Sequence, residues 1–268
     1  MTRRGLTLLE LLLALVVTGI VGTIAADAVI EQTRAHLARG VAASHRDALA
    51  SAAELLAMSL RDAAPSTGDL QLTGDTALDV LAPIGGAVAC AARDDRVLLA
   101  PPDTGGAAPV AFAADAPDAG DALLLLADSA GGAAWIRRII VAVAPVVPDC
   151  PPHMLAGAGR SGVELRVAPA LPDSLAARVA GAPVRVARWI RWATYHAADG
   201  VWWLGQRSCV APGACGGVQP VAGPLAAAEQ GMRVARESSA VVIRLRAAPH
   251  ARATAESLHV RIALRGSP

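Results

Sequence analysis

The pattern of apolar and polar positions begins with a long apolar segment. Residues 6–26 are almost entirely apolar, and Glu10 is the only charged residue among them. A helix over this segment is about 31 Å long at 1.5 Å per residue, close to the roughly 30 Å hydrocarbon core of a bilayer. The segment therefore predicts a transmembrane helix, and Arg3 and Arg4 before it are expected to stay on the cytoplasmic side.

The helical pattern continues beyond the apolar segment. Residues 23–61 are rich in Ala, Leu, Arg and Glu, which favour helices, and the first proline of the chain is Pro65. Positions at steps of three or four form a stripe that we expect to lie against a sheet. Its members are Ile30, Thr33, Leu37, Val41, Ser44, Ala48, Ala52, Leu55 and Ser59. The two segments together predict one helix of about 85 Å, which ends before Pro65.

After Pro65 the chain changes to short apolar runs separated by Gly, Pro and Asp, which is typical of a β-rich domain. Alternation predicts strands at 241–246 and 258–264, and residues 192–203 are predicted to form a hairpin that turns at Asp199-Gly200. Further strands are predicted at 122–127, 135–143, 163–167 and 184–190, and loops at 101–121 and 145–162. The predicted fold is α+β, a long N-terminal helix packed on a β-rich, mainly antiparallel head.

Composition narrows the classes of function. The formal net charge of +1 excludes a strongly basic nucleic-acid binder, and the hydrophobic fraction of 54% excludes a disordered chain. The mean hydropathy of +0.44 is high for an ordinary soluble enzyme and agrees with a membrane segment. The histidines are scattered along the sequence, and no serine stands in a nucleophile elbow. We therefore predict no catalytic residues, no cofactor and no bound metal.

The first residues resemble a known signal. The segment Arg4-Gly5-Leu6-Thr7-Leu8-Leu9-Glu10-Leu11-Leu12 is similar to the prepilin signal of type IV pilins and pseudopilins. The resemblance implies that prepilin peptidase cuts after Gly5, methylates the new N-terminus at Leu6 and leaves the apolar helix on the mature protein. It also implies that Glu10 is required for assembly, where it neutralises the N-terminal amine of a neighbouring subunit. Leu6 departs from the pattern, because that position is usually Phe or Met.

The order of the parts resembles the larger minor pilins and the J-type minor pseudopilin, with a signal helix, a long β-rich body and an extended C-terminal strand. The resemblance implies a leader at residues 1–5, a transmembrane and amphipathic stem at 6–64 and a periplasmic head at 65–268. It implies a single-pass protein of the bacterial inner membrane that enters a type IV pilus or a type II secretion pseudopilus. The implied partners are prepilin peptidase, other pilins or pseudopilins, and the inner membrane.

The cysteines predict disulfides. Cys90, Cys150, Cys209 and Cys215 form an even set in a segment that should be exported. The close spacing of Cys209 and Cys215 favours a bond between them, which leaves Cys90 to pair with Cys150, although four cysteines allow three pairings. The alternative is a zinc site formed by Cys150, His153, Cys209 and Cys215.

Further alternatives stay open on the sequence. Ala26-Asp27-Ala28 has the form of a secretory cleavage site, although the apolar segment is longer than that of an ordinary signal peptide. Residues 157–162 have the letters of a dinucleotide-binding fingerprint, although a predicted strand follows them where a helix is needed. A signal-anchored periplasmic protein with an enzymatic activity is a further alternative function.

Nucleic acid is a less favoured partner. Arginine and tryptophan side chains on one surface could bind single-stranded nucleic acid by stacking and phosphate contact. The candidates are Arg185, Arg188, Arg191, Arg244, Arg246, Trp189, Trp192, Trp202 and Trp203. A DNA-capturing minor pilin is therefore the alternative within the same family.

Overall fold

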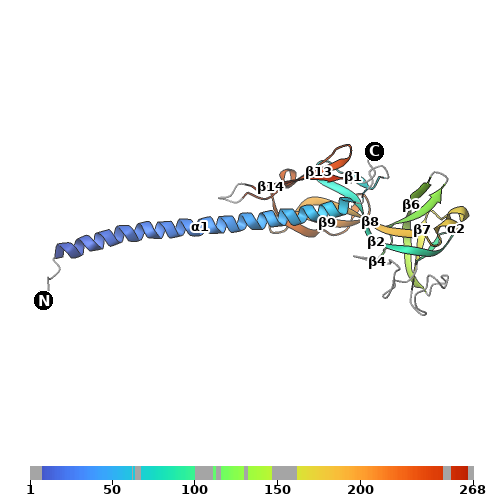
Figure 1. Cartoon of the computed structure of the whole chain (residues 1–268), viewed down its shortest axis with the longest axis horizontal. Helices are drawn as coiled ribbons and strands as arrows, with labels where there is room; N and C mark the ends of the chain where they lie inside the picture. Colours follow the sequence, from blue (N-terminus) through green and yellow to red (C-terminus); the bar gives the residue numbers. More distant parts are fainter. Residues whose placement is uncertain are drawn as a thin grey trace.

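A long helix followed by a β-rich body makes up the molecule (Figure 1). The helix, α1, runs from Leu8 to Arg61 and projects far beyond the body. The predicted α+β fold, with a long N-terminal helix and a mainly antiparallel head, is confirmed. This computed structural model describes residues 8–61, 63, 68–99, 111–112, 116–129, 132–146, 162–249 and 255–264.

The named strands pair antiparallel throughout. Two short helices, α2 (Asp173–Val179) and α3 (Ala228–Gly231), lie between strands. The strands in chain order are β1 Leu70–Leu72, β2 Ala77–Arg93, β3 Arg96–Leu99, β4 Ala111–Phe112, β5 Ala122–Ser129, β6 Gly132–Val146, β7 Gly162–Ala168, β8 Pro183–His196, β9 Trp202–Ala211, β10 Ala214–Cys215, β11 Gln219–Leu225, β12 Met232–Arg236, β13 Ala240–Arg246 and β14 Ser257–Ala263.

Six strands close into a barrel at the end of the molecule away from α1. β2 pairs with β8 from Ala77 opposite Ala193 to Val88 opposite Pro183. The ring continues from β2 through β3, β7, β6 and β5 and returns to β8. Apolar side chains from all six strands fill the interior, as in small barrels generally. Val179 of α2 is buried with them, and Figure 1 shows α2 at the outer end of this barrel.

A second core surrounds the C-terminal third of α1. Here β2 and β8 continue into a sheet with β1, β9, β10 and β11, and β12, β13 and β14 form a separate sheet. Leu56 and Leu60 of α1 are buried in one cluster with Trp192 of β8 and Ile243 of β13. The helix therefore holds both sheets together, and the long strands β2 and β8 run from this core into the barrel.

The buried face of α1 differs from the predicted stripe by about one position. Leu37 and Leu55, both in the stripe, are 68% and 38% exposed, whereas Leu49 and Leu56, outside it, are 3% and 1% exposed. Ala52 is shared by both faces and is fully buried. Neighbouring stripes of this alanine-rich helix are similarly apolar, so the sequence pattern does not show which of them is buried. The sheets cover only the C-terminal part of the helix, so stripe residues before that part are exposed.

The predicted strands are present, several with longer bounds, and the predicted hairpin is formed by β8 and β9. The predicted loop at 101–121 is wrong at Ala111–Phe112, which pairs with β2 as β4. The predicted loop at 145–162 is wrong at its ends, because β6 continues to Val146 and β7 begins at Gly162. Residues 147–161 lie outside the described part of the chain.

Candidate functional site

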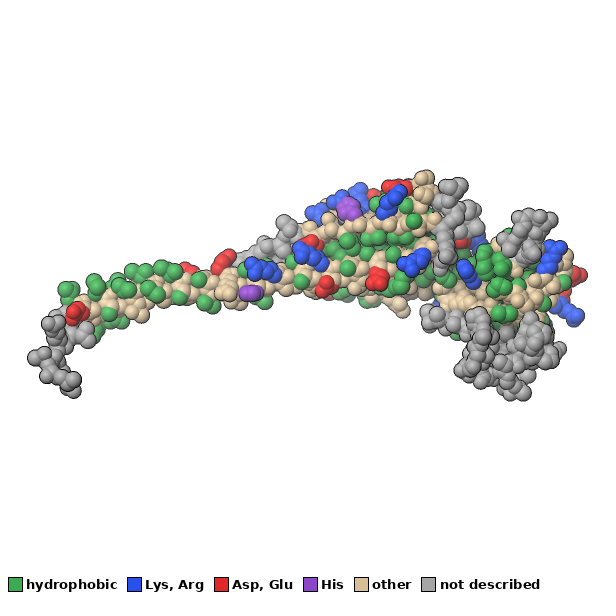
Figure 2. Space-filling model, viewed as in Figure 1, with side chains coloured by type: hydrophobic (Ala, Val, Ile, Leu, Met, Phe, Trp, Pro, Cys, Tyr) green, Lys and Arg blue, Asp and Glu red, His purple; other side chains and the backbone are tan. Residues whose placement is uncertain are grey.

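Residues 8–26 of α1, which we call its apolar half, are apolar on all sides apart from Glu10 and are uncovered. Its most apolar window has a mean hydropathy of 2.3, and none of that window is buried within the molecule. Leu8, Leu13 and Ile24 are 82%, 67% and 64% exposed. Figure 2 shows hydrophobic side chains along this half of the helix, well away from the body. A helix that is apolar all round needs lipid or protein around it, and by length and composition α1 can cross a membrane.

Glu10 is the charged residue of this apolar half. It lies in the first turn of α1 and is exposed among leucines. The first turn favours a carboxylate, because the partial positive charge of the helix N-terminus lies there. A charge within a membrane span nevertheless costs on the order of 2.5 to 3.5 kcal/mol near the centre of the span, so such residues usually have a function. Gly5 and Leu6 lie outside the described residues, so cleavage between them stays a prediction.

Ala26-Asp27-Ala28 lies within the continuous helix α1. The same helix carries the apolar half and the part that packs on the sheets. Cleavage at this site would remove the apolar half, as happens to a secretory signal peptide. Where the mature chain begins therefore stays a prediction.

An ion pair supplements the packing between α1 and the body. Arg46 Nη2 donates a hydrogen bond to Glu256 Oε1 over 2.6 Å, and Glu256 directly precedes β14. This hydrogen bond, together with the charge of Arg46, lowers the pKa of Glu256. The same contact raises the pKa of Arg46. The ion pair therefore links the C-terminal third of the long helix to the start of the C-terminal strand.

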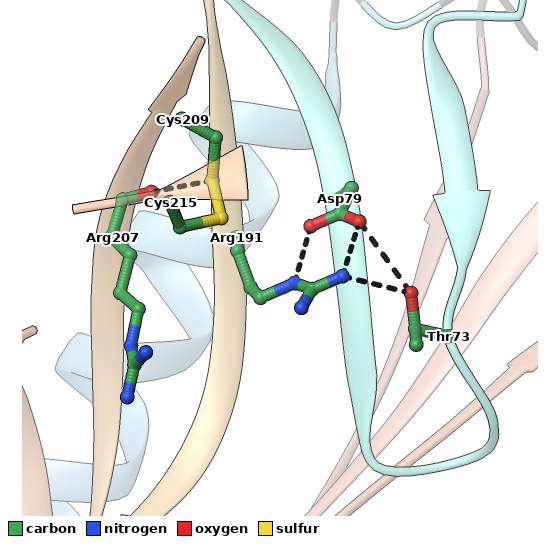
Figure 3. Close-up of a disulfide and its surroundings, with 6 residues drawn as sticks. All are labelled: Thr73, Asp79, Arg191, Arg207, Cys209 and Cys215. Carbon is green, nitrogen blue, oxygen red and sulfur yellow. Dashed lines mark hydrogen bonds and ion pairs between the residues drawn. A yellow bond between two sulfur atoms is a disulfide. The ribbon is translucent and has the colours of Figure 1, made fainter. Parts of the chain in front are cut away.

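Two arginines of β8 are held by buried carboxylates. Arg191 donates from Nε and Nη2 to the two oxygens of Asp79, each over 2.7 Å (Figure 3). The hydrogen bond to Asp79 raises the pKa of Arg191. Arg188 donates in the same way to Asp121 over 2.7 and 2.8 Å. Neither pair was predicted from the sequence. Asp79, the carboxylate within the apolar run at 77–82, was nevertheless a signal, because a buried charge needs a partner.

The arginines and tryptophans of the nucleic-acid alternative are dispersed in the fold, and of its tryptophans Trp202 and Trp203, on β9, are half-buried. Arg188 and Arg191 are engaged by the buried carboxylates, and Trp189 and Trp192 are 6% and 1% exposed. Arg244 and Arg246 lie on β13 in the separate sheet. Arg185 stacks instead over Trp135, with its guanidinium carbon 4.7 Å from the ring centroid. Single-stranded nucleic acid would therefore find no continuous stacking face among the predicted residues.

Cys209 and Cys215 are joined by a disulfide, the pairing that their close spacing predicts (Figure 3). Cys90 is buried and disulfide-bonded. Cys150 and His153 lie outside the described residues, so the pairing of Cys90 with Cys150 stays a prediction. The zinc alternative is wrong for this oxidised form, because the bond between Cys209 and Cys215 removes two of the four proposed thiolate and imidazole ligands.

Two other candidate ligand sites, one for a metal and one for a dinucleotide, are not supported either. Asp79 has a carboxylate oxygen within 4.8 Å of the sulfurs of Cys209 and Cys215. That carboxylate accepts two hydrogen bonds from Arg191, and the sulfurs are bonded to each other, so these groups do not form a metal site in the oxidised protein. Residues 157–161 of the dinucleotide fingerprint lie outside the described part of the chain, and Gly162 begins β7 where that motif requires a helix.

Comparison with known proteins identifies the N-terminal segment. Residues 1–26 match the family model described as the prokaryotic N-terminal methylation motif, which is the type IV pilin signal. The match includes Gly5, Leu6 and Glu10. No curated protein and no solved structure matches the chain. The chain therefore carries the signal of a type IV pilin-like substrate of prepilin peptidase, and the signal and the apolar helix together indicate a membrane-anchored protein.

Proposed function

We propose that the chain is a minor pilin or pseudopilin, a structural and non-enzymatic subunit of a type IV pilus or a type II secretion pseudopilus. Residues 1–5 are the leader that prepilin peptidase removes, residues 6–64 are the stem and residues 65–268 are the periplasmic head. The methylated N-terminus is at Leu6. The stem is held in the inner membrane and then packs against other pilins or pseudopilins in the filament.

The observation that carries the proposal is the continuity of α1. The helix is uncovered and apolar over residues 8–26, and one face of its C-terminal third is buried against two sheets. A membrane anchor can be joined to its domain by any flexible linker. A filament subunit needs a rigid connection, because packing of the stems then fixes the position of each head. Burial of Leu56 and Leu60 and the Arg46–Glu256 ion pair provide such a connection.

In this proposal Glu10 sets the register between stems. The carboxylate is costly in lipid, and in a filament the amine at Leu6 of a neighbouring subunit can neutralise it. Opposite charges in an apolar bundle stabilise the arrangement in which they meet, because every other register leaves a charge buried without a partner. Pairing therefore selects one axial offset between neighbouring helices.

The experiment compares two substitutions in the bacterium that makes the protein. Glu10→Leu removes the charge and its insertion cost, so we expect normal cleavage after Gly5 and normal membrane levels, but little protein in sheared filaments. Gly5→Val should block cleavage itself. Leu13→Ile, an exchange within the same apolar half, serves as the matched control and should assemble normally. Intact mass of the mature chain should correspond to a start at Leu6 with one methyl group.

Two results would contradict the proposal. A mature chain that begins at Val29 would show that the apolar segment is a secretory signal. Incorporation of Glu10→Leu into filaments at the level of the parent would show that the carboxylate has no part in assembly.

A further inference from the structure

The sheet of β12, β13 and β14 has one face on the core and one face in solvent. Met232, Val234, Ile243 and Leu245 lie on the core face and are at most 4% exposed. The opposite face carries cationic and histidine side chains, and Figure 2 shows such side chains gathered over this part of the body. They are Arg233, Arg244, Arg246, His259 and Arg261.

Three of these side chains lie in one cross-strand row. Arg233 on β12 is directly opposite Arg244 on β13, and Arg244 is directly opposite His259 on β14. Side chains directly opposite each other are the closest neighbours in an antiparallel sheet, and like charges there destabilise the pairing. Folding stability therefore does not explain this row, which we call the basic row.

The acidic partners of this face lie at its edges. Arg233 pairs with Asp75 over 3.3 Å, and Arg261 pairs with Glu237 over 2.9 Å. Within the described part of the chain, neither Arg244 nor His259 makes a hydrogen bond or an ion pair with a side chain. The centre of the basic row therefore has donors that the protein itself leaves unused.

The basic row lines an open groove of about 280 Å³. Ala235 and Val242 lie opposite each other beside the row and contribute small apolar surface to the same groove. Short side chains at this position leave room above the sheet, so groups from another molecule can reach Arg244 and His259. The groove is thus open, positively charged at its centre and bordered by the carboxylate of Asp75.

We propose that the basic row is a docking site for an acidic segment of a partner protein. Arginine binds carboxylates through two parallel hydrogen bonds, which suits Asp or Glu side chains entering the groove over Arg244. A nucleic acid fits this face less well, because no Phe, Tyr or Trp is among the described side chains that line the groove, whereas surfaces that bind single strands usually offer such rings for stacking. The inference does not depend on assembly into a filament.

The test measures binding of a fluorescent oligo-glutamate peptide to the full-length chain in neutral detergent micelles at low ionic strength. The parent should bind, and added salt should weaken the complex. Arg244→Glu should weaken binding by about tenfold or more, as expected for the loss of a charge-assisted pair. Arg236→Glu is the matched control, because alternation along β12 places this exposed residue on the other face of the same sheet. It changes the net charge equally and should bind as the parent does.

A second variant distinguishes loss of binding from misfolding of Arg244→Glu. Arg244→Gln removes the charge without introducing a new one and should weaken binding several-fold with an unchanged melting temperature. The proposal is overturned if the parent does not bind the peptide, or if Arg244→Gln and Arg236→Glu bind equally. It is also overturned if an oligothymidylate competes for Arg244 and binds more tightly than the peptide, which would assign the row to nucleic acid.

Discussion

Asp79 shows how one residue can connect distant parts of the chain. The residue is 1% exposed, and its carboxylate is bound by Arg191, which lies 112 positions further along the sequence. Thr73 Oγ1 is also within 3.4 Å of Asp79 Oδ2, so the buried oxygens are well supplied with donors. A buried charge of this kind is tolerated because its partner is held in place by the paired strands β2 and β8.

Removing the charge of Asp79 should strongly destabilise the fold. Asp79→Asn leaves the Arg191 guanidinium in a partly buried place without a counter-charge, and breaking such a pair typically costs about 3 to 5 kcal/mol in the free energy of unfolding. Asp118→Asn is the control, because the side chain of Asp118 is 79% exposed beside Arg188 and its loss should cost less than about 1 kcal/mol. Denaturant unfolding of the full chain in micelles, followed by tryptophan fluorescence, measures both values. An equal loss in the free energy of unfolding for the two variants would show that the buried Asp79–Arg191 pair stabilises the fold no more than the exposed pair does.

Residue-level prediction from sequence worked where the information was local. The bond between Cys209 and Cys215 follows from a separation of six residues. The partner of Asp79 could not be found in this way, because several arginines were available and the fold alone decides which of them reaches the carboxylate. Arg188 and Arg191 were named only as candidates for a nucleic-acid surface, because the sequence does not show that carboxylates engage them.

At the scale of elements, the buried face of α1 is open to a direct test. Leu56→Ala removes a side chain that is 1% exposed and should lower the free energy of unfolding by about 2 to 5 kcal/mol. Leu55→Ala makes the same change one position earlier, where the side chain is 38% exposed, and should cost less than about 1 kcal/mol. Thermal unfolding of both variants distinguishes the observed face from the stripe that the sequence predicted. A larger loss at Leu55 would favour the predicted stripe.

The ion pair between α1 and β14 should make their contact sensitive to acid. The pKa of Glu256 is lowered from its ordinary value of 4.5 by the hydrogen bond from Arg46, so the folded protein holds the proton less tightly than the unfolded chain does. The stabilisation is therefore complete above that ordinary value and is lost as the pH falls through the lowered pKa. Arg46→Ala should remove this dependence.

Hydrogen exchange near the start of β14, measured on both proteins over this acidic range, checks the expectation. In the parent, protection of these amides should decrease as the pH is lowered. In Arg46→Ala it should already be low at neutral pH. An identical profile in the two proteins would show that the ion pair does not hold the strand.

Strands could be predicted from the sequence where one face of the sheet is buried and the other is exposed to solvent. β13 and β14 alternate clearly, because they cover α1 on one side and face solvent on the other. β2 was missed because it passes from one core into the other, so both of its faces are buried in places. Its register also shifts between Pro83 and Gly85, and such residues normally indicate a loop.

At the scale of the whole molecule, two cores share two strands. β2 and β8 contribute buried side chains both to the cluster around α1 and to the barrel. Closure of the barrel pairs segments that are far apart in sequence. The alternation of apolar and polar residues within a strand does not show which strand it pairs with. The fold class could therefore be predicted from sequence, whereas the barrel could not.

Shared strands should make the two cores unfold together. Ile140→Ala empties part of the barrel core, where Ile140 is fully buried, and should cost about 2 to 5 kcal/mol. Ile139→Ala is the control, because that neighbouring side chain is 39% exposed. Calorimetry should show one transition whose midpoint falls in Ile140→Ala, and hydrogen exchange in β13, outside the barrel, should rise as well. Separate transitions, with only one of them shifted, would show independent cores.

The ladder between β2 and β8 also has a mechanical consequence. β1 and β4 pair with β2, and β9 pairs with β8, along the stretch that leads from the α1 core to the barrel. Bending the paired strands β2 and β8 at this place would stretch several hydrogen bonds at once. The connection between the α1 core and the barrel is therefore rigid and does not act as a hinge. Torque applied to the apolar end of α1 is consequently delivered to the barrel, some tens of ångströms away, as rotation of the whole head.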